Sequence, residues 1–352
     1  MTRVESHWTD RFRQQFELCA VGRGDTAVVL SESASRAELV ETAALALQAI
    51  GARVVRIGLA TPPNRGPVPI RSTGASVAID GNPVAIAALG AADFVADCTV
   101  EGLLHAPELG AILSAGARVL MISNEHPELF ERMEHDPGLA ERVAAGKALL
   151  DEGHTMHVAS PAGTDLNVDL GGAFRAGSHG YTNRPGDIAH WPGGLVLAFP
   201  ASGTVNGVVV LAPGDVNLTF KEYLRSEVRL TIVDDHITSI NGDGVDAALF
   251  AAYLEAFGEP EAYATSHVGW GMNPAARWEA LALYDKSQVN GTELRAFAGN
   301  FLYSTGANEV AGRFCRGHFD LPMRACTVTL DDRPVVVDGR LIPELASPEG
   351  AS

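Results

Sequence analysis

A histidine and an aspartate stand two positions apart near the end of the chain, in the sequence Gly-His-Phe-Asp-Leu-Pro at 317–322. In an extended strand, residues two apart point to the same face. His318 and Asp320 would therefore present an imidazole and a carboxylate side by side, a common way to supply two ligands to one metal ion. The same pattern also fits the exposed polar face of an ordinary strand, so it indicates a metal site only together with a third ligand.

His267 is the candidate third ligand. It ends an apolar run and precedes the glycine- and proline-containing segment 268–274, a place where loops often carry binding residues. A structural histidine is the alternative. With His318 and Asp320 it completes a set of two imidazoles and one carboxylate, which leaves three positions on one face of an octahedral iron(II) open for a bidentate substrate and dioxygen. Tetrahedral zinc accepts the same ligand types, so the set leaves the metal undecided.

Two further histidines lie where a cleft is expected. His105 follows a predicted strand of a parallel sheet, and His190 lies in the turn-rich segment 187–194. Ligands of such sheets bind beyond the carboxyl ends of the strands, and a histidine titrates close to neutral pH. Both are candidate acid/base groups, with an ordinary surface histidine as the alternative for each.

The first part of the chain alternates short β-rich runs with helical patterns, which favours βαβ units and a parallel sheet. The predicted strands are 26–30, 53–57, 92–97, 118–122 and 154–158, and the predicted helices include 35–50, 83–89 and 138–150. The first strand runs into Ser-Glu-Ser-Ala-Ser-Arg-Ala-Glu, which has none of the glycines of a dinucleotide-binding loop. Residues 1–160 are therefore predicted to form a Rossmann-like α/β domain without a nucleotide.

From about residue 160 the strands follow one another directly. The predicted strands are 164–170, 194–198, 205–211, 228–233, 236–241, 325–330 and 335–337, and the predicted helices are 244–257 and 275–284. A hairpin is expected at Asp234-Asp235. Residues 161–352 are thus predicted to form an α+β domain, and this domain would carry the metal site.

Composition limits the class of partner. The formal net charge is −17, from 26 basic and 43 acidic residues, which argues against nucleic acid or an anionic membrane as a partner. No apolar stretch is long enough to span a bilayer, and the polar start of the sequence does not fit a secretory signal. The four cysteines are scattered, as in a reducing compartment. A cytoplasmic protein is expected.

Five short segments, spread in order over both predicted domains, carry a resemblance to a known family. They are LLHAPE (103–108), HWPGG (190–194), SHVGWG (266–271), GNFLYSTGAN (299–308) and HFDLPMRAC (318–326). In these segments the chain resembles bacterial 2,5-dihydroxypyridine 5,6-dioxygenases over nearly its whole length. The same segments are similar, more distantly, to the thermophilic-type metalloaminopeptidases.

The aminopeptidase likeness breaks down at the metal ligands. Those enzymes have a glutamate where this chain has His267, a second glutamate where HWPGGLV offers no carboxylate, and a histidine that GNFLYSTGAN lacks. A two-metal site needs such carboxylates to offset four positive charges. What remains, including His318-x-Asp320, suits a single divalent ion.

The resemblance implies an iron(II)-dependent, extradiol-type enzyme that opens 2,5-dihydroxypyridine or a close hydroxypyridine between C5 and C6. Both atoms of O2 would be incorporated to give N-formylmaleamate, in nicotinate or pyridine catabolism, and the enzyme would be a homo-oligomer. His267, His318 and Asp320 would hold Fe(2+), with His105 as the acid/base and His190 as a second catalytic candidate.

The pocket is expected to be lined by side chains within or next to these segments. The candidates are Leu104, Asn167, Tyr303 and Ser304 as substrate contacts, with Trp270 and Phe319 as shields against water. Asn167 departs from the family pattern, in which a histidine is expected, so a hydroxypyridine with another substituent is a possible substrate.

Three rival functions remain. The first is an aminopeptidase-like hydrolase on the same scaffold, which would need a second metal. The second is a non-catalytic binding protein with no bound iron. The third is an NAD-dependent enzyme, which the missing glycine fingerprint disfavours.

Overall fold

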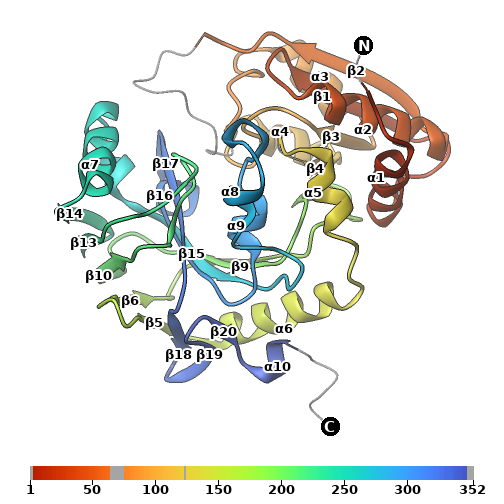
Figure 1. The fold of residues 1–352 in the computed structure, drawn as a ribbon. Helices are drawn as coiled ribbons and strands as arrows, with labels where there is room; N and C mark the ends of the chain where they lie inside the picture. The colour runs from red at the N-terminus through yellow and green to blue at the C-terminus, as the bar shows by residue number, and fades with distance from the viewer. Residues whose placement is uncertain (1–2, 64–74, 123, 347–352) are drawn as a thin grey trace.

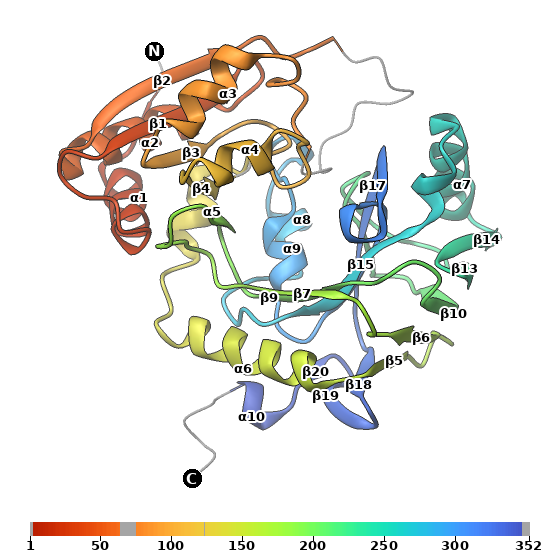
Figure 2. The same cartoon turned by 180° about the vertical axis from the view of Figure 1, so that it is seen from behind.

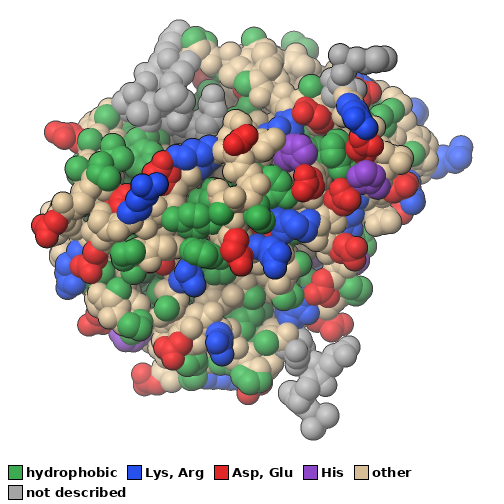
Figure 3. Space-filling model, in the orientation of Figure 1, with side chains coloured by type: hydrophobic (Ala, Val, Ile, Leu, Met, Phe, Trp, Pro, Cys, Tyr) green, Lys and Arg blue, Asp and Glu red, His purple; other side chains and the backbone are tan. Residues whose placement is uncertain are grey.

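A computed structural model describes residues 3–63, 75–122 and 124–346 of the chain. The molecule consists of a parallel sheet with helices on both faces and, beside it, two antiparallel sheets packed on each other (Figures 1 and 2). Acidic and basic side chains intermix over the face drawn in Figure 3. Within the described ranges, no helix is both long enough and apolar enough to cross a bilayer.

The parallel sheet has the strand order β2-β1-β3-β4-β8. Its strands are β1 (Thr26–Glu32), β2 (Arg53–Leu59), β3 (Phe94–Asp97), β4 (Arg118–Met121) and β8 (Ile188–His190). The central strands β3 and β4 are buried along their whole length, as expected for a sheet covered on both faces.

Five helices cover this sheet. They are α1 (Ser6–Leu18), α2 (Ala37–Ile50), α3 (Pro83–Gly90), α4 (Leu109–Ser114) and α5 (Pro127–Arg132). Apolar side chains of α1, α2 and α5 form one core with the sheet, and those of α3 and α4 form a second core with the other residues of β1, β3 and β4.

An eight-stranded antiparallel sheet has the order β14-β13-β10-β6-β5-β18-β19-β20. Its strands are β5 (Thr155–Ala159), β6 (Asp165–Asp169), β10 (Val205–Leu211), β13 (Val228–Val233), β14 (His236–Asn241), β18 (Thr327–Leu330), β19 (Arg333–Val337) and β20 (Arg340–Leu341). The predicted hairpin joins β13 to β14, and both of its aspartates have the positive φ that such a turn requires: 45° at Asp234 and 73° at Asp235.

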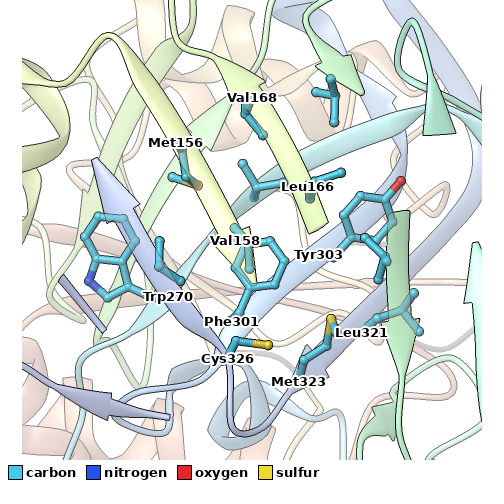
Figure 4. Packing of buried hydrophobic residues seen from close by; sticks show 14 of the residues in the cluster. Met156, Val158, Leu166, Val168, Trp270, Phe301, Tyr303, Leu321, Met323 and Cys326 are labelled. Atoms are coloured by element: carbon cyan, nitrogen blue, oxygen red, sulfur yellow. The ribbon is translucent and has the colours of Figure 1, made fainter. Parts of the chain in front are cut away.

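A five-stranded antiparallel sheet has the order β17-β16-β15-β9-β7. Its strands are β7 (Phe174–Ser178), β9 (Leu195–Phe199), β15 (Thr265–Gly271), β16 (Phe301–Asn308) and β17 (Arg313–Met323). One face of this sheet packs on the eight-stranded sheet in a large apolar core. Figure 4 shows Met156, Val158, Leu166 and Val168 from the first layer meeting Trp270, Phe301, Tyr303 and Leu321 from the second.

The remaining elements flank the two antiparallel sheets. They are α6 (Gly138–Glu152), β11 (Val216–Asn217), β12 (Glu222–Tyr223), α7 (Val245–Phe257), α8 (Ala280–Leu283), α9 (Thr292–Ala296), α10 (Pro343–Ala346) and the 3-10 turns η1 (Pro260–Tyr263), η2 (Lys286–Gln288) and η3 (Glu309–Ala311). Helix α6 packs on β7 and β9, and α7 packs on β17. The sequence predicts one helix over 275–284, but only the single turn α8 forms there.

The predicted fold class is confirmed: a parallel α/β sheet is joined to an α+β part. The strand predicted at 154–158 lies elsewhere than expected, because β5 pairs with β6 and β18 rather than with the parallel sheet. In its place β8 joins β4. The chain therefore crosses between the two parts more than once, and the expected single boundary near residue 160 is not how the sheets are divided. The local sequence of a strand does not determine which sheet the strand joins.

Candidate metal centre

His267, His318 and Asp320 converge on one face of the five-stranded sheet. His267 comes from β15 and the other two from β17, and their ligand atoms all lie within 4.8 Å of one another. Asp320 Oδ1 is 3.3 Å from His318 Nε2 and 3.6 Å from His267 Nε2. All three residues are buried. His318 and Asp320 thus share one face of β17, as the two-residue period of a strand predicts, and β15 places His267 beside them.

Strand β16 lies between the two ligand-bearing strands and places small residues beneath the cluster. Ser304 pairs with Asp320, and Gly306 pairs with His318. Gly306 has a φ of +111°, and a Cβ there would lie 2.1 Å from the carbonyl oxygen of Gly317, so only glycine fits. Because β16 has small residues here, side chains of the neighbouring strands β15 and β17 can approach each other over it.

Ser266 fixes the orientation of His267, and Ser304 lies beside its other ring nitrogen. Ser266 Oγ donates to the carbonyl of Ala307 and lies 3.1 Å from His267 Nδ1. Because its only proton is used on that carbonyl, Ser266 must accept one from Nδ1, which leaves the lone pair of Nε2 directed at the cluster. Ser304 Oγ lies 3.1 Å from this Nε2 and donates to Asp320 Oδ1.

The electrostatics suit a cation. Burial lowers the pKa of His267 to about 3, so its imidazole is neutral and able to bind a metal. Burial alone would raise the pKa of Asp320, but Arg295 and His318 outweigh it and hold that pKa well below its usual range. Arg295 donates from Nε to Oδ2 of Asp320, which leaves Oδ1 facing both histidines.

The donor set fits a single divalent ion. Two imidazoles and one carboxylate are the facial set of mononuclear iron(II) oxygenases, and zinc accepts the same donors. In addition, Nδ1 of His318 is buried without a hydrogen-bond partner among the described residues. Such an atom is costly when unpaired, and because it lies across the ring from the Nε2 that faces Asp320, a bound ligand or water rather than the ion would satisfy it.

Two more of the predicted histidines, His105 and His190, lie near this site and belong to the parallel-sheet part. His105 follows β3, its ring centroid is 5.6 Å from that of His318, and its Nδ1 is 3.2 Å from Glu309 Oε1. His190 ends β8, and its Nε2 is 3.2 Å from Thr292 Oγ1. Burial, aided by Arg295, lowers the pKa of His190 to about 3, so it is neutral. Strands β3 and β8 end at the same edge of the sheet, where ligands of such sheets bind.

Several predicted pocket residues lie elsewhere. Trp270, Tyr303 and Phe319 are fully buried in the core on the opposite face of the five-stranded sheet, so their side chains do not line the cluster. Figure 4 shows Trp270 and Tyr303 in this core. Asn167 is exposed on β6, in the eight-stranded sheet, so its departure from the family pattern gives no reason to expect a different substrate. Leu104 is 38% exposed beside His105.

The sequence analysis missed three residues that support the cluster: Ser266, Arg295 and Glu309. Ser266 was visible, because it adjoins His267 in a segment already singled out. Arg295 belongs to the short helix α9, and Glu309 to the turn η3 after β16. Neither lies in a local pattern that points to a ligand, and only the tertiary fold brings them to Asp320 and His105.

Comparisons with known proteins identify the family of the chain. A sequence profile of the NicX family, described as 2,5-dihydroxypyridine 5,6-dioxygenase, matches residues 7–343. The chain is 36% identical over 340 residues to a 2,5-dihydroxypyridine 5,6-dioxygenase of Pseudomonas putida KT2440, covering 95% of each chain.

Solved structures give the same result. The fold matches a structure of 2,5-dihydroxypyridine dioxygenase from Pseudomonas putida KT2440 with a TM-score of 0.90 and 35% identity, over 96% of this chain and 98% of that one. It also matches AmpT from Thermus thermophilus with a TM-score of 0.60 and 13% identity, over 96% and 99% of the two chains, a likeness of fold alone. Both resemblances seen in the sequence are thus confirmed, and the chain belongs to the 2,5-dihydroxypyridine 5,6-dioxygenase family.

Proposed function

We propose that this protein is an iron(II)-dependent dioxygenase that opens 2,5-dihydroxypyridine between C5 and C6 and forms N-formylmaleamate. The observation that carries the proposal is the convergence of His267, His318 and Asp320 within 4.8 Å in a buried site. Family membership supports the same reaction class. Two neutral nitrogens and one carboxylate oxygen would hold the ion and leave positions open beside it.

A bound iron(II) would supply one site shared by dioxygen and the ring, and a path for electron density from the ring to dioxygen. The protein's own residues would keep the geometry and manage protons. Ser266 fixes the ring of His267 through Nδ1, and Arg295 fixes Asp320 through Oδ2. Because all three ligands are buried, bulk water would be kept from the reacting groups.

His105 is the proposed acid/base. Burial opposes ionisation of Glu309, but the hydrogen bond from His105 outweighs it and lowers the pKa of that carboxyl. Glu309 therefore holds Nδ1 of His105, and Nε2 is the atom that would take a proton from the substrate hydroxyl and later return it. Neutral His190 would contact a ring substituent, and Leu104 would give the ring an apolar neighbour.

The aminopeptidase-like alternative is less well supported. Among the described residues, one group of three or more His, Cys, Asp or Glu side chains could hold a metal ion: His267, His318 and Asp320. This group contains a single carboxylate. Two-metal hydrolysis needs more negative charge than this. The likeness to AmpT extends to the fold, and a fold does not imply an activity.

The test is oxygen uptake by protein loaded with iron(II) under anaerobic conditions and then given 2,5-dihydroxypyridine in air-saturated buffer. We expect one O2 consumed per ring opened. His105→Ala should slow turnover by about 10²- to 10⁴-fold, the usual contribution of a general acid/base, and should keep its iron. A protein that purifies with two zinc ions and cleaves peptides would overturn the proposal, and loss of iron in His105→Ala would overturn the role of His105.

The cytoplasmic location, the homo-oligomer and the place in nicotinate catabolism stay predictions. The identity of the hydroxypyridine substrate is also a prediction. A screen of ring-substituted substrates in the same oxygen assay would identify it.

A further inference from the structure

A buried glutamate outside the metal cluster binds the segment that supports one of the ligands. Glu125 follows β4 and is fully buried. Its Oε1 accepts the backbone N–H groups of Gly291 at 2.8 Å and Thr292 at 2.9 Å, and its Oε2 accepts that of Asn290 at 2.8 Å. One carboxylate from the parallel-sheet part thus binds three successive amides of the other part.

The segment 290–295 carries this anchor to the metal site. Thr292, its third residue, contacts His190 through Oγ1, 3.2 Å from the ring Nε2. Arg295, at its end, donates from Nε to Asp320 Oδ2. Only a few residues separate the amides that Glu125 binds from the guanidinium that binds the ligand carboxylate, so displacement of the first would move the second.

A second contact across the two parts keeps α9 in place. The guanidinium of Arg132, in α5, binds both carboxylate oxygens of Glu293, at 2.8 and 2.5 Å. Hydrogen bonds to an ionised carboxylate are about twice as strong as neutral ones. Since α9 is a short helix, these contacts rather than its own length must define its position.

We propose that Glu125 is a positioning residue for the metal centre: it acts through segment 290–295 to keep Arg295 on Oδ2 of Asp320, so that Oδ1 stays directed at the ion. This rests on the proposed function only in requiring that His267, His318 and Asp320 bind a divalent ion. Groups that orient a ligand in this way typically change metal affinity by about 10- to 100-fold when removed.

The chain offers a matched control. Asp235 is also fully buried, and it also accepts three backbone N–H groups, those of Gly203, Thr204 and Val205, at 2.6 to 2.9 Å. Its side-chain ion pair is with Arg313, not with a residue of the cluster. Asp235→Asn should therefore reproduce the structural cost of disturbing a buried carboxylate without the effect on the metal.

The experiment measures iron(II) affinity by competition with a chelator, under anaerobic conditions, on the full chain. Glu125→Gln should weaken iron binding by about 10-fold, because the amide group that replaces one oxygen cannot accept from a backbone N–H. Asp235→Asn should stay within about 2-fold of the unmodified protein. Glu125→Asp, which keeps the charge on a shorter arm, should recover part of the loss.

The decisive comparison repeats Glu125→Gln in an Arg295→Met background. If Glu125 acts through Arg295, the additional loss should be under about 2-fold, because the group it positions is gone. A full 10-fold loss in that background, or an unchanged affinity in Glu125→Gln alone, would overturn the proposal. If Glu125→Gln does not fold, the same comparison is made with Glu125→Asp in the unmodified chain and in the Arg295→Met background. Failure of the unmodified chain to bind iron(II) would count against the proposed function instead.

Discussion

The two faces of the five-stranded sheet have opposite character although the same strands build them. One face carries His267, His318 and Asp320. The other carries Trp270 and Phe319, fully buried against the eight-stranded sheet and α7. Side chains alternate along a strand, so direct neighbours in the sequence, such as His318 and Phe319, serve a polar site and an apolar core respectively.

This difference teaches that position in a motif does not determine a role, whereas the face of the strand does. Close packing on the core face holds the sheet rigid, and that rigidity keeps the side chains of His267, His318 and Asp320 together on the site face. Metal binding and folding stability should therefore be separable by substitution at adjacent positions.

The largest effect on activity should come from the site face. His267→Ala removes one of three ligands, and because structural metal sites with about four ligands are worth about 10–16 kcal/mol in total, one ligand is worth on the order of 3 kcal/mol. Iron(II) affinity should fall by roughly 100-fold or more, and oxygen uptake should cease. Titration with iron(II) under anaerobic conditions measures the first. If the variant bound iron(II) as tightly as the unmodified chain, His267 would not be a ligand, and the contrast between the two faces would not hold.

On the core face, Phe319→Ala should act on stability. The Phe319 ring packs edge-on against Phe250 and Tyr253, with centroids 4.4 and 4.8 Å away. Truncating a buried phenylalanine costs about 3–5 kcal/mol, which denaturant unfolding of the metal-free protein would measure. Iron affinity of the folded variant should stay within about 3-fold. A loss of iron as large as in His267→Ala would show that the two faces are not separable.

The meeting of His318 and Asp320 could be predicted from the sequence because a local rule is sufficient there: residues two apart in a strand share a face. The same rule assigns Phe319 to the opposite face, and applying it would have avoided the wrong expectation for that residue. The contacts of Arg295 with Asp320 and of Glu125 with segment 290–295 could not be predicted, since they depend on how two parts of the chain pack. The pairing of β5 and the return of β8 to the first sheet are set by tertiary contacts in the same way.

The smallest predicted effect concerns His190, a buried group of the parallel-sheet part. Its pKa is lowered to about 3 by burial, whereas in the unfolded chain it would lie near 6.5. As the pH falls below about 6.5, the unfolded chain binds a proton that the folded protein rejects, so stability present at neutral pH is lost in acid. Between pH 7.5 and 5.5 this residue should lower the free energy of unfolding by about 1.4 kcal/mol.

His190→Gln isolates that contribution. Glutamine can keep a hydrogen bond to Thr292 but does not titrate, so urea unfolding of the metal-free protein at the two pH values should lose about 1.4 kcal/mol less in the variant. Taking the difference between the proteins cancels the other titrating groups, among them Asp97 and Asp215, in which burial raises the pKa to about 6. An identical pH dependence would mean that His190 is as easily protonated in the folded protein as in the unfolded chain. In that case the edge of the parallel sheet would be open to water, unlike the buried cluster on the five-stranded sheet that it faces.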